Sequence, residues 1–303
     1  MKKKVLPVIV LFCYNRVSHL KKTIYSLMNN YNFKNYQLII FSDGPKNKSD
    51  LIKIKRVREY LSSLKSHKIK VCKNKKNLGL KKNIILQLNK IFKEHEMAII
   101  VEDDILTNKY FLNYMTEALL NFKKRKKIGS ISAYTPINYL KMKKFNFDLY
   151  YSKRHYSWGW GTWSNRWNNF VFDEKKIVKK INKKNIEKFD SIGRDLPILL
   201  DLSLKNKISS WSIYFDFNCL VKNLSCVCPK FSLVKNLGFD ESGTHEHQNF
   251  LNNEIKINWR PINFNKINFS NKIALLEKKS INGDIKQKIK NKFFRLIKMV
   301  YRS

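Results

Sequence analysis

AIIVEDDILTN, residues 98–108, is the stretch that decides the fold. An apolar run leads directly into three consecutive carboxylates, Glu102, Asp103 and Asp104, and the chain then turns apolar again. Continuous apolar runs of about four to eight residues are typical of strands that are buried on both faces. The sequence therefore predicts a core strand that ends in an acidic cluster.

Two interpretations of this acidic cluster are open from the residues alone. Adjacent carboxylates are costly to hold together unless they are solvated, or bind a cation or hydroxyl groups. A hard divalent ion such as Mg2+ or Mn2+ prefers oxygen ligands and can also bridge the phosphates of a ligand. The alternative is a solvated acidic turn that follows a strand.

Strand-like runs alternate with helical patterns through the first half of the chain, which predicts an α/β fold with a mostly parallel sheet flanked by helices. Pro and Gly signals, such as Asp43-Gly44-Pro45, mark the turns. The predicted strands are VIVLFCY (8–14), YQLIIFSDG (36–44), KIKVCKN (68–74) and MAIIVEDD (97–104), and the predicted helices cover 17–30, 49–64 and 80–95.

Polar residues follow three of these strands at their carboxyl ends, where open parallel sheets bind ligands. Asn15 and Arg16 follow the first strand, Asp43 the second, and the acidic cluster the fourth. Arg16 can hold a phosphate, and Asp43 can accept hydrogen bonds from a base or sugar. No glycine-rich phosphate loop is present, so side chains and a metal must neutralise any phosphates.

The stretch SWGWGTWSNRW, residues 157–167, contains four of the six tryptophans. Such aromatic side chains are often core residues. Gly159 and Gly161 alternate with them, however, and suit close backbone approach to a ligand. We therefore expect Trp158 and Trp160 to shape a ligand pocket, with other aromatic residues in the core.

The formal net charge of +38 predicts attraction to polyanions. A genome biased toward A and T would also enrich the chain in lysine, and this bias explains the charge equally well. This charge is compatible with a non-enzymatic nucleic-acid-binding protein. The basic residues are scattered, however, and no motif of a known class of nucleic-acid-binding domain appears. A nucleotidyltransferase is a second rival. The five cysteines show no metal-ligand spacing, which favours a reducing, cytoplasmic location.

Three regions are expected along the chain: a first half with the strand-end clusters (1–135), a second half of the same domain (136–260) and a basic extension (261–303). The basic extension contains an amphipathic helical pattern at 284–301, which could bind an anionic membrane surface or pack on the domain. No run approaches the ~20 apolar residues of a membrane span. The apolar N-terminus lacks a signal-peptide cleavage site and is expected to be a strand.

The ordered set of these motifs resembles GT-A fold glycosyltransferases of the N-acetylglucosaminyltransferase I-like group and their bacterial glycan-assembly relatives. The resemblance rests on six quoted stretches and covers roughly residues 7–165 well and 205–250 less well. The stretches are VIVLFCYNRVSHLKKTIYSL (8–27), IIFSDG (39–44), NLGLKKNI (77–84), AIIVEDDILTNKYFLNYM (98–115), GSISAY (129–134) and SWGWGTW (157–163).

This resemblance implies a Rossmann-like GT-A domain that uses Mn2+ or Mg2+ and a nucleotide-diphosphate sugar, with a UDP-sugar favoured. The acidic cluster takes the place of the family's DXD motif, with Asp104 as the metal ligand and Glu102 and Asp103 contacting the donor's ribose or sugar. Asn15 belongs to the same donor site. Arg16 and Asp43 match positions that hold the diphosphate and the base.

The resemblance also implies a closing loop and a catalytic base. His245 in GFDESGTHEH (238–247) matches a loop that closes over the donor, although a polar surface loop is the alternative. Transfer with inversion needs a carboxylate that takes the acceptor's proton. Relatives carry an aspartate after a tryptophan where this chain has Ser212, so the candidates are Asp240, then Glu241, then Asp216.

Overall fold

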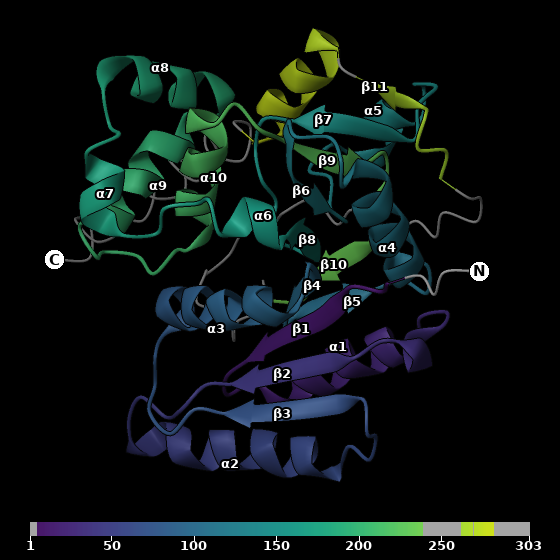
Figure 1. The fold of residues 1–303 in the computed structure, drawn as a ribbon, viewed down its shortest axis with the longest axis vertical. Coiled ribbons are helices and arrows are strands. Elements are labelled where there is room, and N and C mark those ends of the chain that lie inside the picture. Colours follow the sequence, from purple (N-terminus) through teal and green to yellow (C-terminus); the bar gives the residue numbers. More distant parts are fainter. Residues whose placement is uncertain (1–4, 239–261, 269, 282–303) are drawn as a thin grey trace, which may run out of the picture.

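The computed structural model describes residues 5–238, 262–268 and 270–281. Its main feature is a nine-stranded sheet with the order β11-β7-β9-β6-β8-β4-β1-β2-β3, flanked by helices (Figure 1). This architecture confirms the predicted α/β class. The strands are β1 Val8–Cys13, β2 Leu38–Ser42, β3 Ile69–Lys73, β4 Met97–Glu102, β6 Ile128–Ser132, β7 Leu149–Ser152, β8 Trp160–Trp163, β9 Ser225–Pro229 and β11 Ile267–Asn268.

The first half forms the expected alternating unit, in which β1 pairs in parallel with both β2 and β4, and β2 pairs with β3. The carboxyl ends of these four strands consequently meet at one edge of the sheet. Ten helices precede β9: α1 Val17–Met28, α2 Lys48–Ser63, α3 Leu80–Glu94, α4 Phe111–Phe122, α5 Tyr139–Met142, α6 Ser164–Trp167, α7 Glu174–Val178, α8 Lys183–Ile192, α9 Asp195–Leu204 and α10 Ser212–Val221; a 3-10 turn covers Phe33–Asn35, and residues 271–281 are also helical.

Strand β1 is buried on both faces, and its alternating residues enter two different cores. Ile9 and Leu11 pack with the core that includes residues of α1 and α4. Val10 lies in the other core, which includes Ile84 of α3 and Phe215 of α10. Because successive side chains of a strand point to opposite faces, the continuous apolar sequence of β1 is what a sheet covered on both sides requires.

The second half departs from the regular alternation. Strand β8 runs antiparallel to both of its neighbours, β4 and β6, and it lies between them. A separate two-stranded sheet pairs β5 (Ile105–Thr107) with β10 (Val234–Asn236). Helices α7 to α10 gather at the upper left of Figure 1 and share their own apolar cluster.

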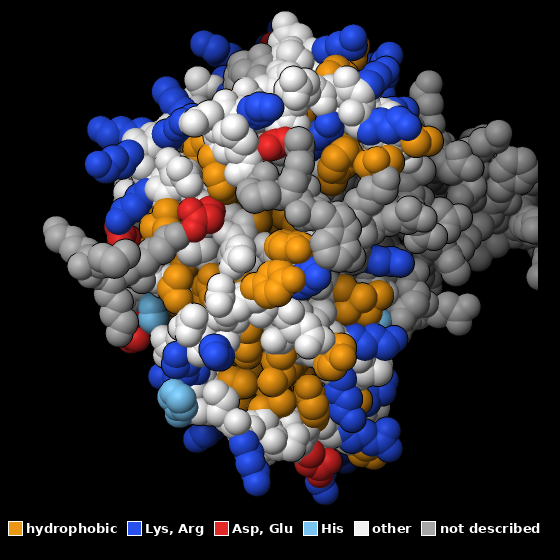
Figure 2. All heavy atoms as spheres, turned by 90° about the vertical axis from the view of Figure 1, so that its right-hand side faces the viewer, with side chains coloured by type: hydrophobic (Ala, Val, Ile, Leu, Met, Phe, Trp, Pro, Cys, Tyr) orange, Lys and Arg blue, Asp and Glu red, His pale blue; other side chains and the backbone are white. Residues whose placement is uncertain are grey.

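Basic side chains are spread over the molecular surface. Figure 2 shows Lys and Arg side chains mostly toward the edges of one face, with few acidic side chains and with apolar and uncharged side chains over its middle. Among the described residues of this face, the basic side chains form no single stripe of the kind that tracks a nucleic-acid backbone. Within the described residues, no helix is long and apolar enough to cross a bilayer.

Candidate functional site

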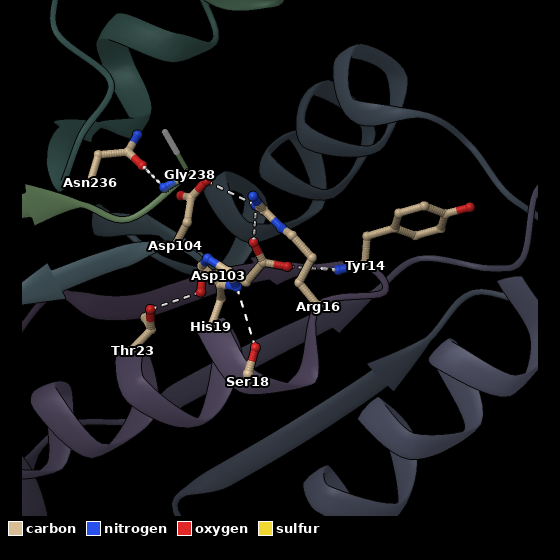
Figure 3. Close-up of polar contacts among 9 residues, drawn as sticks. All are labelled: Tyr14, Arg16, Ser18, His19, Thr23, Asp103, Asp104, Asn236 and Gly238. Atoms are coloured by element: carbon tan, nitrogen blue, oxygen red, sulfur yellow. Dashed lines mark hydrogen bonds and ion pairs between the residues drawn. The ribbon is translucent and has the colours of Figure 1, made fainter. Parts of the chain in front are cut away.

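Arg16 bridges the two aspartates of the acidic cluster (Figure 3). Its Nη2 atom lies 2.9 Å from Asp104 Oδ2 and also bonds Asp103 Oδ1. Arg16 stands at the N-cap of α1 and makes no side-chain capping bond there. A cation at a helix N-terminus is electrostatically unfavourable, so these two carboxylates offset the cost of the position.

Asp103 is fixed by the residues that follow β1. The backbone N–H of Tyr14 donates to Asp103 Oδ2 at 3.2 Å, and the Thr23 hydroxyl donates to the Asp103 carbonyl at 2.8 Å. The residue is 4% exposed. Asp103 therefore has a defined orientation before any ligand binds.

Asp104 is held from the other side by the chain that follows β10. The Leu237 N–H donates to the Asp104 carbonyl at 2.7 Å. Gly238 lies directly against the Asp104 carboxylate, and a Cβ atom at this position would overlap Asp104 Oδ2. The pairing of β10 with β5 thus brings a segment from 130 residues downstream against the acidic cluster.

Three consecutive carboxylates lie at this strand end, and two of them bond the Arg16 guanidinium. Burial, followed by the charges of Asp104 and Asp103, raises the pKa of Glu102 to about 8. Burial also raises the pKa of Asp103, while Arg16 acts against this shift. The neighbouring carboxylates thus disfavour one another's negative charge, and the cluster favours additional positive charge.

The donor set fits a hard divalent cation. A single nitrogen atom reaches oxygens of both Asp103 and Asp104, so the two carboxylates converge on one point where a cation already sits. Carboxylate oxygens are the ligands that Mn2+ and Mg2+ prefer. Among the described residues no group of three or more His, Cys, Asp or Glu side chains converges, so such an ion needs additional oxygens from a ligand or water.

Asp43 organises the loop before α3. Its carboxylate accepts the backbone N–H groups of Gly44, Leu78 and Gly79 at 2.9–3.2 Å, and also the side-chain amides of Asn74 and Asn77. The residue is 4% exposed. Its predicted contact with a nucleotide base would require some of these bonds to open, so the structure gives Asp43 a positioning role instead of that of a free acceptor.

Asn15 is also engaged with the protein. Its side-chain amide donates to Asp50 Oδ1 at 3.0 Å, and the Tyr14 hydroxyl donates to Asp50 Oδ2 at 2.6 Å. Burial and the bond to Asp50 raise the pKa of Tyr14 to about 12. These contacts tie the β1–α1 connection, which carries Arg16, to the first turn of α2.

The two candidate tryptophans differ in their surroundings. Trp160 is fully buried in β8 and stacks on Trp211 with 4.9 Å between ring centroids. Trp160 packs in the core, and its predicted place in a pocket wall stays a prediction. Trp158 is half-buried against Tyr134, just before β8 pairs with the carboxyl-terminal half of β4. The register with β4 ends at Trp160, which pairs with Ile100, and Gly159 with its positive φ of 58° turns the chain before Trp158.

Asp216 lies in a second polar cluster. Its Oδ1 accepts the His155 backbone N–H at 2.6 Å, and the residue is 6% exposed on α10. Burial raises its pKa to about 7, while Arg154 acts against the shift. Arg154 itself pairs with Asp195 through two bonds of 2.8 and 2.6 Å. These contacts give Asp216 a buried structural setting, and its role as the base stays a prediction.

The same segment anchors the C-terminal helix, which covers 271–281. The Tyr156 hydroxyl donates to Glu277 Oε1 at 2.9 Å. Burial raises the pKa of Glu277 to about 7. Arg154, His155 and Tyr156 are therefore three consecutive residues that each bind a carboxylate from a different helix.

Three predicted residues lie outside the described part of the chain. Asp240, Glu241 and His245 fall within 239–261. Gly238, the last described residue before them, contacts Asp104. The sequence analysis did not identify Gly238 or Thr23 as site residues, and the only signal for Gly238 was its place at the start of GFDESGTH.

A pocket elsewhere in the described residues is remote from this site. It has a volume of about 440 Å3 and is lined by apolar and basic residues, including Met28, Phe33, Leu64 and Lys68. These residues belong to the end of α1, the end of α2 and the beginning of β3. The pocket thus lies at the opposite edge of the parallel strands from the acidic cluster.

Comparisons with solved structures give matches of low identity. S. aureus TarS in complex with UDP-GlcNAc is 18% identical over 42% of this chain and 34% of that chain, with a TM-score of 0.31. A second TarS structure matches over 21% of its own length. The mannosyltransferase PcManGT from Pyrobaculum calidifontis, in complex with GDP-Man and Mn2+, is 10% identical over 72% of this chain and 70% of that chain, with a TM-score of 0.39.

The chain thus spans about a third or less of the matched TarS structures. No curated protein sequence matches it. A family model, described as glycosyl transferase family 2, matches residues 8–181, which include β1 to β4 and the acidic cluster. Because this match covers more than half of the chain, the protein belongs to glycosyl transferase family 2.

Proposed function

We propose that the protein transfers a sugar from a nucleotide-diphosphate donor to a hydroxyl of a glycan or lipid-linked acceptor, with inversion at the sugar. Family membership supports the reaction class. A UDP-sugar is the favoured donor. The reaction would serve the assembly of a bacterial surface polysaccharide, such as a capsule or lipopolysaccharide.

The observation that carries this proposal is the position of Arg16. One guanidinium nitrogen joins Asp103 and Asp104 at the carboxyl end of β4, beside the N-terminus of α1. The cation of a metal–diphosphate ligand would meet the carboxylates at this point, and its phosphates would meet Arg16 and the N-terminus of α1. A nucleotide diphosphate can bind here without a glycine-rich loop, because a cation, an arginine and helix N–H groups supply positive charge.

Asp104 is the residue proposed to hold Mn2+ or Mg2+, with Glu102 and Asp103 contacting the ribose or sugar of the donor. When bound, the ion neutralises charge on the diphosphate leaving group. Asn15 and Arg16 line the phosphate side of the site. Trp158 offers an aromatic surface to the sugar, and His245 belongs to the segment proposed to close over the donor.

In the transfer step the acceptor oxygen attacks the anomeric carbon while the bond from that carbon to the diphosphate oxygen breaks. A carboxylate takes the proton of the acceptor hydroxyl. Asp240 is the first candidate and Glu241 the second, because both follow Gly238, which touches Asp104. The nucleoside diphosphate leaves with the electron pair of the broken bond.

A peripheral site of action at the inner face of a membrane is proposed from the amphipathic pattern of 284–301, which lies outside the described residues. A basic amphipathic helix binds anionic lipid. The assignment of 1–135, 136–260 and 261–303 to donor binding, acceptor binding and extension remains a prediction. Neither the nucleic-acid-binding rival nor the nucleotidyltransferase gains support from a specific feature of the described residues.

Calorimetric titration of UDP-sugars with and without Mn2+ tests the proposal. Binding should require the metal and should disappear in Asp104→Ala. Asp201→Ala is the matched control, because Asp201 is exposed on α9 and pairs only with Lys205 one turn away. Metal-independent binding, or equal loss in both variants, contradicts the proposal. Hydrolysis assays across UDP-, GDP- and CMP-sugars then identify the donor.

A further inference from the structure

The geometry points to an exchange of cations at the acidic cluster: the divalent ion displaces Arg16 from the Asp104 oxygen that it bonds, and the freed guanidinium then binds the donor's diphosphate. This inference rests on the proposed function. It makes Arg16 the residue that couples metal binding to donor binding.

The position of the Arg16 side chain supports competition for the same oxygen atoms. Its Nη2 atom is bonded to Asp103 Oδ1 and lies 2.9 Å from Asp104 Oδ2. A guanidinium and a divalent ion cannot occupy the same carboxylate oxygen, and their like charges repel at contact distance. Metal binding at Asp104 therefore requires Arg16 to leave that oxygen.

Arg16 can move without disturbing the fold around it. Its side chain is 24% exposed, and its backbone carbonyl is held in the first turn of α1 by the Leu20 N–H at 3.0 Å. The backbone of the cluster is held independently of Arg16, because Thr23 binds the Asp103 carbonyl and Leu237 binds the Asp104 carbonyl, and Tyr14 also holds the Asp103 carboxylate. Rotation of the Arg16 side chain is sufficient for the exchange.

A diphosphate at this position would receive the displaced guanidinium. Arg16 is the N-cap of α1, and the first turn of that helix contains no acidic residue. The N–H groups and the dipole at this end favour an anion. The guanidinium bonds phosphate oxygens as well as carboxylate oxygens, so it exchanges one charged partner for another.

The exchange predicts that metal and donor each raise the affinity for the other. The metal alone must compete with Arg16, whereas in the presence of a diphosphate Arg16 has an alternative partner. Such coupling is reciprocal and ordinarily amounts to about 5- to 150-fold. A metal bridge to the phosphates adds to this coupling, so the test must isolate the part that depends on Arg16.

Mn2+ affinity is measured by the electron paramagnetic resonance signal of free Mn2+, with and without UDP. Arg16→Gln should bind Mn2+ alone about tenfold more tightly than the wild type, because one charge-assisted competitor is gone. With UDP present, Arg16→Gln should bind Mn2+ about tenfold less tightly than the wild type does with UDP. The opposite signs of the two changes are the signature of exchange.

Two variants complete the design. Lys22→Gln removes the same charge from an exposed position on α1 and should change neither affinity by more than about twofold. Arg16→Lys keeps the charge but lacks the planar fork, so Mn2+ alone should bind more tightly than in the wild type. Arg16→Lys replaces Arg16→Gln as the test variant if circular dichroism shows that Arg16→Gln is unfolded.

Equal or weaker binding of Mn2+ alone in both Arg16 variants overturns the exchange, and so does a Lys22→Gln effect of the same size. The transferase proposal survives that result if the wild type still binds UDP with Mn2+. Conversely, a wild type that binds no UDP in the presence of Mn2+ overturns the transferase proposal, and the exchange with it.

Discussion

Replacing Asp43 by asparagine tests whether this residue organises the loops after β2 and before α3 or contacts the nucleotide-sugar donor directly. Asp43 is 4% exposed, and its two oxygens accept bonds from three backbone N–H groups and two asparagine side chains. Asparagine keeps the shape of the side chain. It replaces one acceptor oxygen with an NH2 group, which cannot accept a hydrogen bond.

The loss of stability depends on which hydrogen-bond donors can adapt to the new side chain. Side-chain amides can turn to present oxygen, but backbone N–H groups cannot. If the new NH2 replaces Oδ2, the Gly79 N–H loses its acceptor, and if it replaces Oδ1, the Gly44 N–H does. One buried N–H without a partner costs about 1–3 kcal/mol, and the remaining bonds lose their charge assistance. Asp43→Asn should therefore destabilise the protein by about 3 kcal/mol.

Urea unfolding followed by circular dichroism measures this change. Asp201→Asn is the control, because its exposed ion pair with Lys205 contributes less than about 0.5 kcal/mol. The organising role is refuted if Asp43→Asn changes the free energy of unfolding by less than about 1 kcal/mol while UDP affinity falls tenfold. That combination would mark Asp43 as a direct ligand contact.

Three further changes test other parts of the structure. Gly238→Ala should lower the Mn2+-dependent affinity for UDP about tenfold in calorimetry, because the new Cβ overlaps Asp104 Oδ2. The free energy of unfolding should change little, and an unchanged UDP affinity would contradict this contact. Trp160→Ala should lower the free energy of unfolding by about 3–5 kcal/mol, as expected for a fully buried tryptophan, and a change below 1 kcal/mol would remove it from the core. Folded Glu277 has a pKa of about 7 against an ordinary 4.5, so its contribution to stability is complete below pH 4.5 and is lost as the pH rises to 7. Glu277→Gln should reduce the loss of stability that urea unfolding detects between about pH 5 and about pH 8, and an unchanged slope would show that Glu277 titrates normally.

The sequence was sufficient to predict the first half of the fold. Strands β1 to β4 and helices α1 to α3 follow the predicted ranges, because each carries a continuous apolar run or an amphipathic pattern. Strand β8 was not identified as a strand. Its four residues, WGTW, are buried on both faces and show no alternation, and glycine is depleted in strands, so the pattern carried no strand signal.

Positions at strand ends were predictable, whereas individual side-chain roles were not. Topology alone predicts that Arg16 and the acidic cluster meet, and the bond from Arg16 to Asp104 agrees with that prediction. Whether a side chain faces a ligand or the protein depends on neighbours distant in sequence. Asp43 is bound by residues 74–79, and Trp160 is covered by Trp211 and Phe215, which no local pattern identifies.

The position of β8 has a consequence for how the chain emerges from the ribosome. After residue 102 the four parallel strands can assemble, but β4 then has no neighbour on one side. Its partner, Trp160–Trp163, is synthesised about 60 residues later. A nascent chain paused between these points presents an apolar, unpaired strand edge, the form of β structure most prone to aggregation and to capture by chaperones.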